Sequence, residues 1–243
     1  MTNSFNKLNK IFRLGVDCFY PPRCPMCDRV IRPGAGICKE CEDKVEFIGE
    51  PTCFKCGKML LNEDEIYCYD CRRNPKVFDR GFAVFQYDSI KESLYKFKYG
   101  SRAEYARYYA VKTVEHLGKV IEEINPEAFI PVPVHKSRFK KRGYNQAYEY
   151  AMNLSGLTGI PVMDGLVSRA KRTKAQKELN PLQRQKNLKK AFKLCAFGVK
   201  LQRVCVIDDI YTTGSTINAI TLLLKQAGIK EVFFITIAIG QGF

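Results

Sequence analysis

After Pro75, segments with the apolar spacing of strands alternate along the chain with segments that have the spacing of amphipathic helices. Short apolar runs predict strands within 80–88, 128–135, 160–169, 203–208 and 231–239. Helices are predicted from a cap at Ser89 through Tyr99, along the apolar face from Ala106 to Ile121, over 144–155, and from Ile217 to a stop at Gly228. This alternation is typical of an α/β fold in which helices cover both faces of a parallel sheet.

The residues before Pro75 follow neither pattern for long. Phe5, Leu8 and Phe12 recur at helical spacing and predict a short amphipathic helix, which we expect to pack on the rest of the protein rather than on a membrane. The following residues are rich in cysteine and turn residues, so a hydrophobic core alone does not explain how they fold. We therefore predict three segments: the helix at 1–20, a small module at 21–75 and an α/β domain at 76–243.

Four Cys-x-x-Cys pairs follow one another at regular spacing in the module. They are Cys24 and Cys27, Cys38 and Cys41, Cys53 and Cys56, and Cys68 and Cys71. Two such pairs supply the four thiolates of a closed tetrahedral site, so the module is predicted to hold two structural Zn²⁺ ions. We favour pairing of neighbours in sequence, although interleaved pairing fits the same spacing. Cys205, within an apolar run, is expected to be a small core residue.

The net charge of +15 is concentrated in two segments. Residues 135–142 hold five Lys and Arg and no acid, and residues 169–190 hold nine against the single acid Glu178. This pattern indicates a polyanionic partner such as phosphate, pyrophosphate or nucleic acid. Residues 171–190 are too many for an idle connection, and we interpret them as a mobile lid with a helix around 182–191.

The cysteine-rich module does not share this basic character. From Cys18 to Arg73 it has nine Lys and Arg against ten Asp and Glu, and zinc-bound thiolates add negative charge. A scaffold or protein-docking role is therefore favoured for it over DNA binding. Because no apolar run is long enough to span a membrane and no export signal is recognised, we expect a cytoplasmic protein.

Two adjacent acids, Asp208 and Asp209, end the predicted strand at 203–208 and precede the hydroxyl-rich loop 211–216. At the carboxyl end of a parallel strand they would face the crevice in which α/β proteins bind ligands. Gly214 lets the backbone approach a ligand closely, and the amides at the start of the next helix form an anion site. Carboxylates beside such a site suit a ligand with vicinal hydroxyls and a phosphate, such as a ribose 5-phosphate.

The string VCVIDDIYTTGST (204–216) resembles the motif with which type I phosphoribosyltransferases bind phosphoribosyl pyrophosphate (PRPP). The resemblance implies that Asp208 and Asp209 accept the ribose 2′ and 3′ hydroxyls. It assigns the 5′-phosphate to Thr212, Thr213, Gly214, Ser215 and Thr216. The strings at 131–147 and 172–192, together with the cysteine module, resemble the ComF competence family, which joins a double zinc ribbon to a phosphoribosyltransferase domain.

The resemblance also implies how a transfer reaction would be catalysed. The pyrophosphate loop falls at 134–138, with His135, Lys136 and Arg138 as PRPP ligands and 140–142 behind them. Departing pyrophosphate would be stabilised by Mg²⁺ and by cations, for which the candidates are Arg169, Lys171, Arg172, Lys174 and Arg184. The predicted catalytic residues are accordingly Asp208, Asp209, Arg169 and Lys174. Alternatively, Tyr144, Asn145 and Gln146 are expected to cap and pack the next helix.

Three functions are compatible with the sequence. The first is an enzyme that transfers a phosphoribosyl group from PRPP to an unidentified acceptor, such as a nucleobase or a nucleotide. The second is a PRPP sensor or accessory factor that works with a DNA-uptake protein and has no turnover. The third is a single-stranded DNA-binding protein that uses the two basic segments, with Phe139 and Tyr144 available for base stacking.

Overall fold

The computed structural model describes residues 21–169, 191–195 and 200–240. The chain divides into two compact units, Met1–Glu46 and Phe47–Phe243. This boundary falls between the second and third Cys-x-x-Cys pairs, so each unit contains two of the four pairs. The predicted helix at 1–20 and the predicted lid at 171–190 lie outside the described residues.

The first unit is organised around its cysteines. An antiparallel bridge between Arg23 and Val30 flanks the first pair, and the short helix α2 (Lys39–Glu42) begins at the second pair. Its buried apolar residues are few: Cys24, Ile31 and Cys41, with Met26, Cys27, Ile37 and Cys38 packed against them. So small a core needs a further cross-link to be stable on its own.

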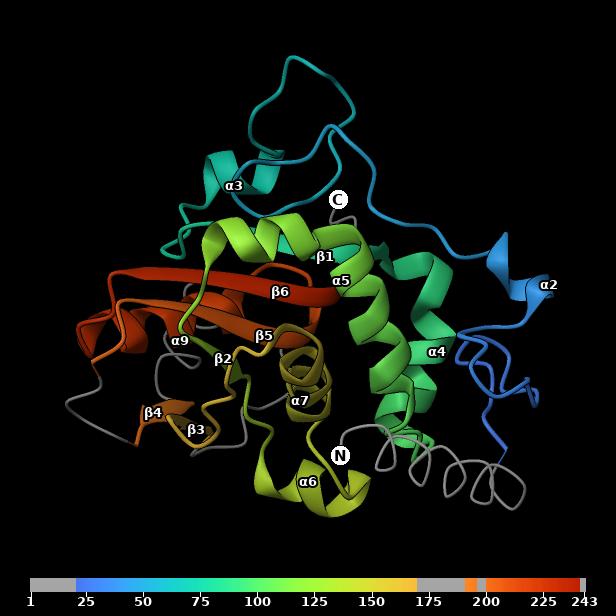
Figure 1. The fold of residues 1–243 in the computed structure, drawn as a ribbon. Helices are drawn as coiled ribbons and strands as arrows, with labels where there is room; N and C mark the ends of the chain where they lie inside the picture. Colours follow the sequence, from blue (N-terminus) through green and yellow to red (C-terminus); the bar gives the residue numbers. More distant parts are fainter. Residues whose placement is uncertain (1–20, 170–190, 196–199, 241–243) are drawn as a thin grey trace, which may run out of the picture. The chain divides into compact units, whose positions relative to one another are not determined.

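A four-stranded sheet with the order β1-β6-β5-β2 forms the centre of the second unit (Figure 1). Its strands are β1 (Gly81–Gln86), β2 (Ala128–Pro131), β5 (Arg203–Tyr211) and β6 (Glu231–Ile239). All three pairings are parallel, which confirms the predicted kind of sheet. Residues 204–207 of β5 and 232–239 of β6 are almost entirely apolar because both faces of these inner strands are covered there.

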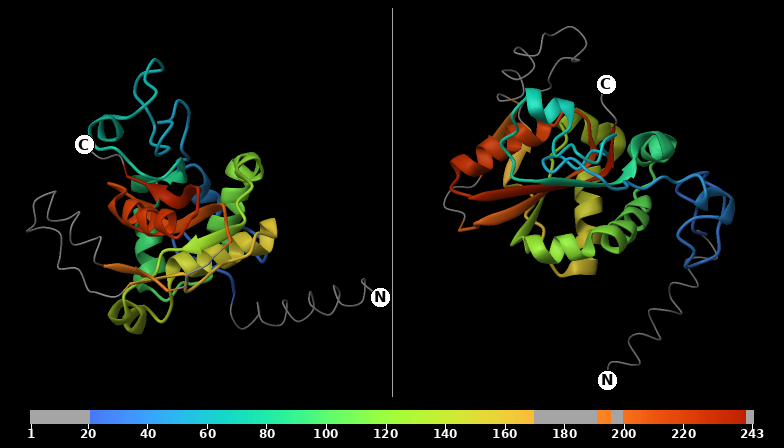
Figure 2. Two further views of the ribbon diagram at one scale, coloured as in Figure 1. Left: turned by 90° about the vertical axis from the view of Figure 1, so that its left-hand side faces the viewer. Right: turned by 90° about the horizontal axis from the view of Figure 1, so that it is seen from above.

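Helices cover both faces of this sheet, as predicted. They are α4 (Tyr87–Tyr99), α5 (Tyr105–Ile124), α7 (Gln146–Thr158) and α9 (Ser215–Gln226). The short helix α6 (Lys136–Arg142) follows β2 and has no buried residues. Figure 2 shows α9 on one side of the sheet and α5 with α7 on the other. Val204 and Val206 of β5 belong to the core that α9 covers, and Cys205 between them is fully buried, which confirms it as a core residue. Among the described helices, none combines the length and apolar character needed to cross a membrane.

The start of α4 differs from the prediction. Strand β1 runs directly into the helix, so Gln86 occupies the N-cap position and the helix begins at Tyr87. The hydroxyl of Ser89 donates a hydrogen bond of 3.0 Å to the carbonyl of Gln86. The prediction of Ser89 as the cap is therefore wrong, because the helix begins two residues before it and Gln86 holds the N-cap position.

The predicted strand within 160–169 is divided into two short pieces. Val162 forms an isolated parallel bridge with Phe129 of β2. After a turn at Gly165, whose φ is 84°, β3 (Val167–Arg169) pairs antiparallel with β4 (Phe192–Leu194) in a separate two-stranded sheet. Strand β4 was not predicted, since three residues are too few to show a period.

Candidate functional site

Four cysteine sulfurs converge at one place in each compact unit. The sets are Cys24, Cys27, Cys38 and Cys41 in the first unit, and Cys53, Cys56, Cys68 and Cys71 in the second. Within each set all the sulfurs lie within 4.8 Å of one another. The pairing of neighbours in sequence is thereby confirmed.

The sulfur spacing fits zinc. Cys27 Sγ lies 3.6 Å from Cys38 Sγ, and Cys56 Sγ lies 3.7 Å from Cys68 Sγ. Zn–S bonds of about 2.3 Å in a tetrahedron give S···S edges of about 3.8 Å. Four thiolates complete the coordination shell, so both sites suit structural ions and leave no position open for a reacting ligand.

The acid pair lies within β5 and not after its end, where it was predicted. Strand β5 continues to Tyr211 because its pairing with β6 persists, with Asp208 opposite Thr236. On the other side, β2 ends with Pro131 opposite Ile207. The two acids therefore occupy the stretch of β5 that has lost its neighbour on the β2 side, and a crevice opens there.

The two carboxyl groups have different surroundings. Burial, and then the negative charge of Asp209, raise the pKa of Asp208 to about 7. The carboxylate of Asp209 is paired with Lys98 of α4, whose Nζ lies 3.1 Å from Asp209 Oδ2. Asp208 is thus a carboxyl group that can gain or lose a proton near neutral pH.

The loop after β5 leads into α9 with a conformation that requires glycine. Gly214 has a φ of 72° and is the N-cap residue of α9. A Cβ at this position would lie 2.4 Å from the hydroxyl of Tyr211, which packs beneath the loop. The first-turn amides of α9 have no partners within the helix and form an anion site beside the acids.

The opposite wall of the crevice comes from the segment after β2. Asn145 is the N-cap of α7, accepting a hydrogen bond from the amide of Ala147 at 3.2 Å, and its side-chain amide donates to the carbonyl of Val132 at 3.0 Å. Arg142 donates to Gln146 Oε1 at 2.7 Å. The alternative prediction was that Tyr144, Asn145 and Gln146 cap and pack the next helix. It is confirmed for Asn145, which is the N-cap of α7, and for Gln146, which is buried at the start of the helix.

A cavity of about 260 Å³ lies between these walls. Some of the residues predicted to bind PRPP or to act in catalysis line this cavity. They are Asp208, Asp209, Thr212, Thr216, Arg138 and Arg169. It is also lined by Arg142, which was predicted to lie behind the pyrophosphate loop, by Asn145 and Gln146, and by Lys98, which was not predicted. The crevice thus combines two acids, two hydroxyls and four cationic side chains.

Other nominated residues lie elsewhere. Residues 136–142 form α6 and not an open loop, and His135 caps that helix by accepting a hydrogen bond of 3.2 Å from the amide of Ser137. The lining of the cavity does not include His135, Lys136, Thr213, Gly214 or Ser215. Lys174 and the other nominated residues of the lid lie outside the described part of the chain.

Lys98 lines the cavity and was not predicted from the sequence. It lies near the end of α4, far from Asp209 in the chain, within a helical segment that looks like an ordinary amphipathic surface. Its side chain is only 18% exposed, because the helix directs it toward the acid pair. No local pattern identifies such a residue, since its partner is set by how α4 packs beside the sheet.

Comparison with known proteins agrees with this arrangement. Residues 15–72 match the model of the double zinc ribbon domain. Competence protein F of Haemophilus influenzae is 31% identical over 206 residues, covering 81% of this chain and 87% of its own. Competence protein ComFC of Streptococcus pneumoniae is 29% identical, with coverages of 81% and 84%. The DNA utilization protein YhgH of Escherichia coli is 27% identical, with coverages of 87% and 94%.

Two solved structures are similar to part of the chain. One is a purine phosphoribosyltransferase from Pyrococcus horikoshii, with 18% identity and a TM-score of 0.35 over 54% of this chain and 73% of that one. The other is an adenine phosphoribosyltransferase, with 13% identity and a TM-score of 0.37 over 58% of this chain and 73% of that one.

Fold and cysteine sites together define a protein in which a double zinc ribbon precedes a parallel α/β domain. The extent of its likeness to competence protein F then settles its family. The chain belongs to the ComF family of competence proteins.

Proposed function

We propose that the second unit binds PRPP in the crevice beside β5 and transfers its phosphoribosyl group to an acceptor, with release of pyrophosphate. The observation that carries this proposal is one shared cavity, in which Asp208 and Asp209 lie with Thr212 and Thr216 at the start of α9. A sugar phosphate needs acceptors for its hydroxyls and donors for its phosphate, and these two sets of groups supply them.

The ribose 5-phosphate half of the ligand fits the β5 side of the crevice. Hydroxyls at the 2′ and 3′ positions donate to the carboxylates of Asp208 and Asp209. The 5′-phosphate accepts hydrogen bonds from the hydroxyls of Thr212 and Thr216 and from the first amides of α9, where the helix dipole favours an anion. Thr213, Gly214 and Ser215 contribute through the backbone of this loop.

The pyrophosphate half fits the cationic side. Arg138 and Arg142 of α6, Arg169 of β3 and Lys98 of α4 line the cavity there. Arginine is suited to phosphate oxygens because it donates two parallel hydrogen bonds. Lys174 and its neighbours in the predicted lid, with His135 and Lys136, are retained as further candidates.

The chain's own residues lower the barrier by placing carboxylates around the ribose and cationic side chains around the pyrophosphate. The bond between ribose C1 and pyrophosphate breaks, its electron pair leaves with pyrophosphate, and the acceptor forms the new bond to C1 and releases a proton. The arginines stabilise the charge that develops on the departing oxygens. Carboxylate oxygens suit Mg²⁺, which when bound with PRPP neutralises part of its charge.

The biological setting is inferred from the relatives. Their names associate them with competence and with DNA utilization. We infer that this protein acts in the cytoplasm on a nucleobase or nucleotide acceptor during the handling of incoming DNA, with a DNA-uptake protein as a partner.

Two measurements test the proposal. Calorimetric titration with PRPP and Mg²⁺ determines whether the crevice binds the ligand. An assay of pyrophosphate release, run with a panel of nucleobases and nucleotides, then separates the enzyme from a sensor that binds PRPP without turnover. Binding with release supports transfer, binding without release for any acceptor supports the sensor, and no binding contradicts both.

Single-stranded DNA binding is favoured as a second function by the surface next to α6. Phe139 is 50% exposed and Tyr99 is 49% exposed, and the guanidinium of Arg142 lies 4.7 Å from the centre of the Tyr99 ring. Basic groups interleaved with exposed aromatic rings suit stacked bases. Tyr144, nominated earlier for stacking, instead donates its hydroxyl to the carbonyl of Phe97 and is only partly exposed. Competition between PRPP and a labelled oligonucleotide tests whether the two ligands share Arg142.

A further inference from the structure

The second zinc ribbon is joined to the loop after β5 by one buried ammonium group. Lys76 Nζ lies 2.8 Å from Asp70 Oδ2 and donates a hydrogen bond of 3.0 Å to the carbonyl of Thr213. Asp70 lies on α3 (Tyr69–Arg73), between the zinc-site residues Cys68 and Cys71. The Lys76 side chain is only 4% exposed, so its charge depends on these two partners.

A shared core reinforces this connection. Phe78, which follows the ribbon, packs edge-on against the rings of Tyr211 and Phe234, and Tyr211 stacks on Phe234 with 4.8 Å between ring centres. Cys53, Cys56 and Cys68 belong to the same buried cluster as Tyr211. The hydroxyl of Tyr211 lies directly beneath Gly214, so this cluster also supports the loop from below.

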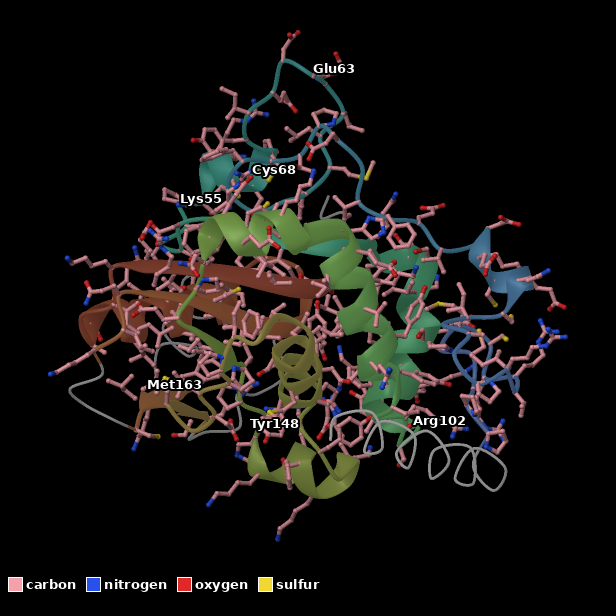
Figure 3. All side chains as sticks on the ribbon, in the orientation of Figure 1. Lys55, Glu63, Cys68, Arg102, Tyr148 and Met163 are labelled. Carbon is pink, nitrogen blue, oxygen red and sulfur yellow. The ribbon has the colours of Figure 1, made fainter. Side chains whose placement is uncertain are left out.

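Backbone contacts fix the ribbon against the sheet. The amide of Gly81 in β1 donates to the carbonyl of Lys55, which lies between Cys53 and Cys56. The Lys55 ammonium lies 5.6 Å from the centre of the Phe78 ring. Lys55 and Cys68 both lie near α3 in Figure 3. Both Cys-x-x-Cys turns of the second ribbon are therefore connected to the α/β domain, one through Lys55 and the other through Asp70.

We propose that Lys76 is a positioning residue through which the second zinc ribbon holds the loop 211–216 in its phosphate-binding form. Zinc at Cys53, Cys56, Cys68 and Cys71 and a phosphate ligand at the start of α9 then bind cooperatively. This inference rests on the proposed PRPP site. Because coupling between two ligands is reciprocal, PRPP must in turn raise the affinity of this site for zinc, which we expect to observe as slower loss of the ion.

The zinc site of the first unit provides an internal control. Its cysteines pack in a separate cluster within residues 24–41, and none of them belongs to the cluster that contains Tyr211. PRPP is therefore expected to protect one four-cysteine site and leave the other unchanged in the same molecule.

The test uses the full chain loaded with two zinc ions. The protein is mixed with a zinc chelator and an alkylating reagent, with and without PRPP and Mg²⁺, and mass spectrometry of peptides follows each cysteine over time. At saturating PRPP, alkylation of the second-site cysteines is expected to slow by about tenfold, with no change at the first site. Equal rates with and without PRPP at the second site, when PRPP is bound, would overturn the inference.

Variants separate positioning from simple stability. In Lys76→Met the protection by PRPP is expected to disappear, and PRPP affinity to fall about tenfold, as for the loss of a hydrogen bond to a charged group. Lys76→Arg keeps the charge and should restore most of both. Lys225→Met is the matched control, because Lys225 also pairs with an acid, Asp79 at 2.9 Å, and donates to a carbonyl, but at the far end of α9. Undiminished protection in Lys76→Met would contradict the proposal.

A second readout decides the inference even if the wild-type protein binds no PRPP. Hydrogen exchange of a peptide spanning 209–218 reports whether the loop is held by the ribbon without any ligand. Faster exchange in Lys76→Met than in Lys225→Met supports the coupling between ribbon and loop. If the wild type binds no PRPP, this result shows that only the identity of the ligand was wrong. Identical exchange in the two variants shows that Lys76 does not position the loop.

Discussion

Lys98 of α4 forms an ion pair with Asp209 of β5, with 3.1 Å between Nζ and Oδ2. The pair joins a helix to the acid motif across the crevice and sets a cation beside two adjacent carboxyl groups. PRPP carries several negative charges, so at the proposed site a cation that lines the cavity and pairs with Asp209 would stabilise the bound ligand.

Replacing Lys98 by Met is therefore expected to weaken PRPP binding by about tenfold in a calorimetric titration. Lys91→Met removes an exposed lysine from the same helix and serves as the control, with unchanged affinity expected. Equal affinities in the two variants would show that Lys98 has no part in binding.

Asp208 is expected to lower the stability of the ligand-free protein at alkaline pH. Burial and Asp209 raise its pKa from 3.8 to about 7 in the folded state, so the folded protein loses stability as the pH rises from about 4 to 7, and the full cost remains above pH 7. Asp208→Asn removes this cost and should raise the Tm at pH 8 by at least about 2–4 °C. The gain should shrink as the pH is lowered toward 5.5, where the folded wild-type protein keeps its proton. Thermal unfolding at several pH values checks this, with a substitution of the exposed Asp88, Asp88→Asn, as a control. A gain in Tm that does not depend on pH would contradict ionisation of Asp208 as its cause.

Loss of the first zinc site and loss of the second should affect the stability of the α/β domain differently. Cys53→Ala/Cys56→Ala removes ligands that share the buried core of the second unit, and we expect one zinc ion to be lost and the Tm to fall by about 10 °C. Cys24→Ala/Cys27→Ala should also lose one zinc ion but leave the main unfolding transition within about 2 °C. Metal analysis with calorimetry measures both, and equal shifts in Tm would argue against the division at Glu46.

Gly214→Ala should impair the loop more than a typical surface change. The residue has a φ of 72°, and the new Cβ would meet the Tyr211 hydroxyl at 2.4 Å, so the loop must move. A cost of about 1–3 kcal/mol is expected, together with at least tenfold weaker PRPP binding. Gly156→Ala in α7, where a Cβ meets nothing within 4 Å, should be neutral or slightly stabilising. If both variants bind PRPP as the wild type does, the loop has no role in binding.

The sequence predicted what depends on local pattern. Apolar runs identified β1, β2, β5 and β6, and the Cys-x-x-Cys spacing identified both zinc sites, because each signal is complete within a short stretch. The position of the acids within β5 could not be read in this way, since it depends on where β2 stops pairing.

Lys98 and Lys76 were not predicted because each acts across a long separation in the chain. Lys98 reaches Asp209 from a helix, and Lys76 reaches Thr213 from the end of the zinc ribbon. In sequence both look like ordinary surface lysines. Only the packing of α4 and of the second ribbon shows that Lys98 lines the crevice and that Lys76 donates a hydrogen bond to the loop after β5.

We propose that the acid pair and the start of α9 form a PRPP site. Calorimetric titration of PRPP and Mg²⁺ into the wild type, into Asp208→Asn/Asp209→Asn and into Glu122→Gln/Glu123→Gln tests it most directly, since the last variant neutralises an adjacent, exposed acid pair on α5. Binding by the wild type and the α5 variant, with binding lost in the β5 variant, is the result predicted. Binding that survives in the β5 variant, or no binding by the wild type, would contradict the account.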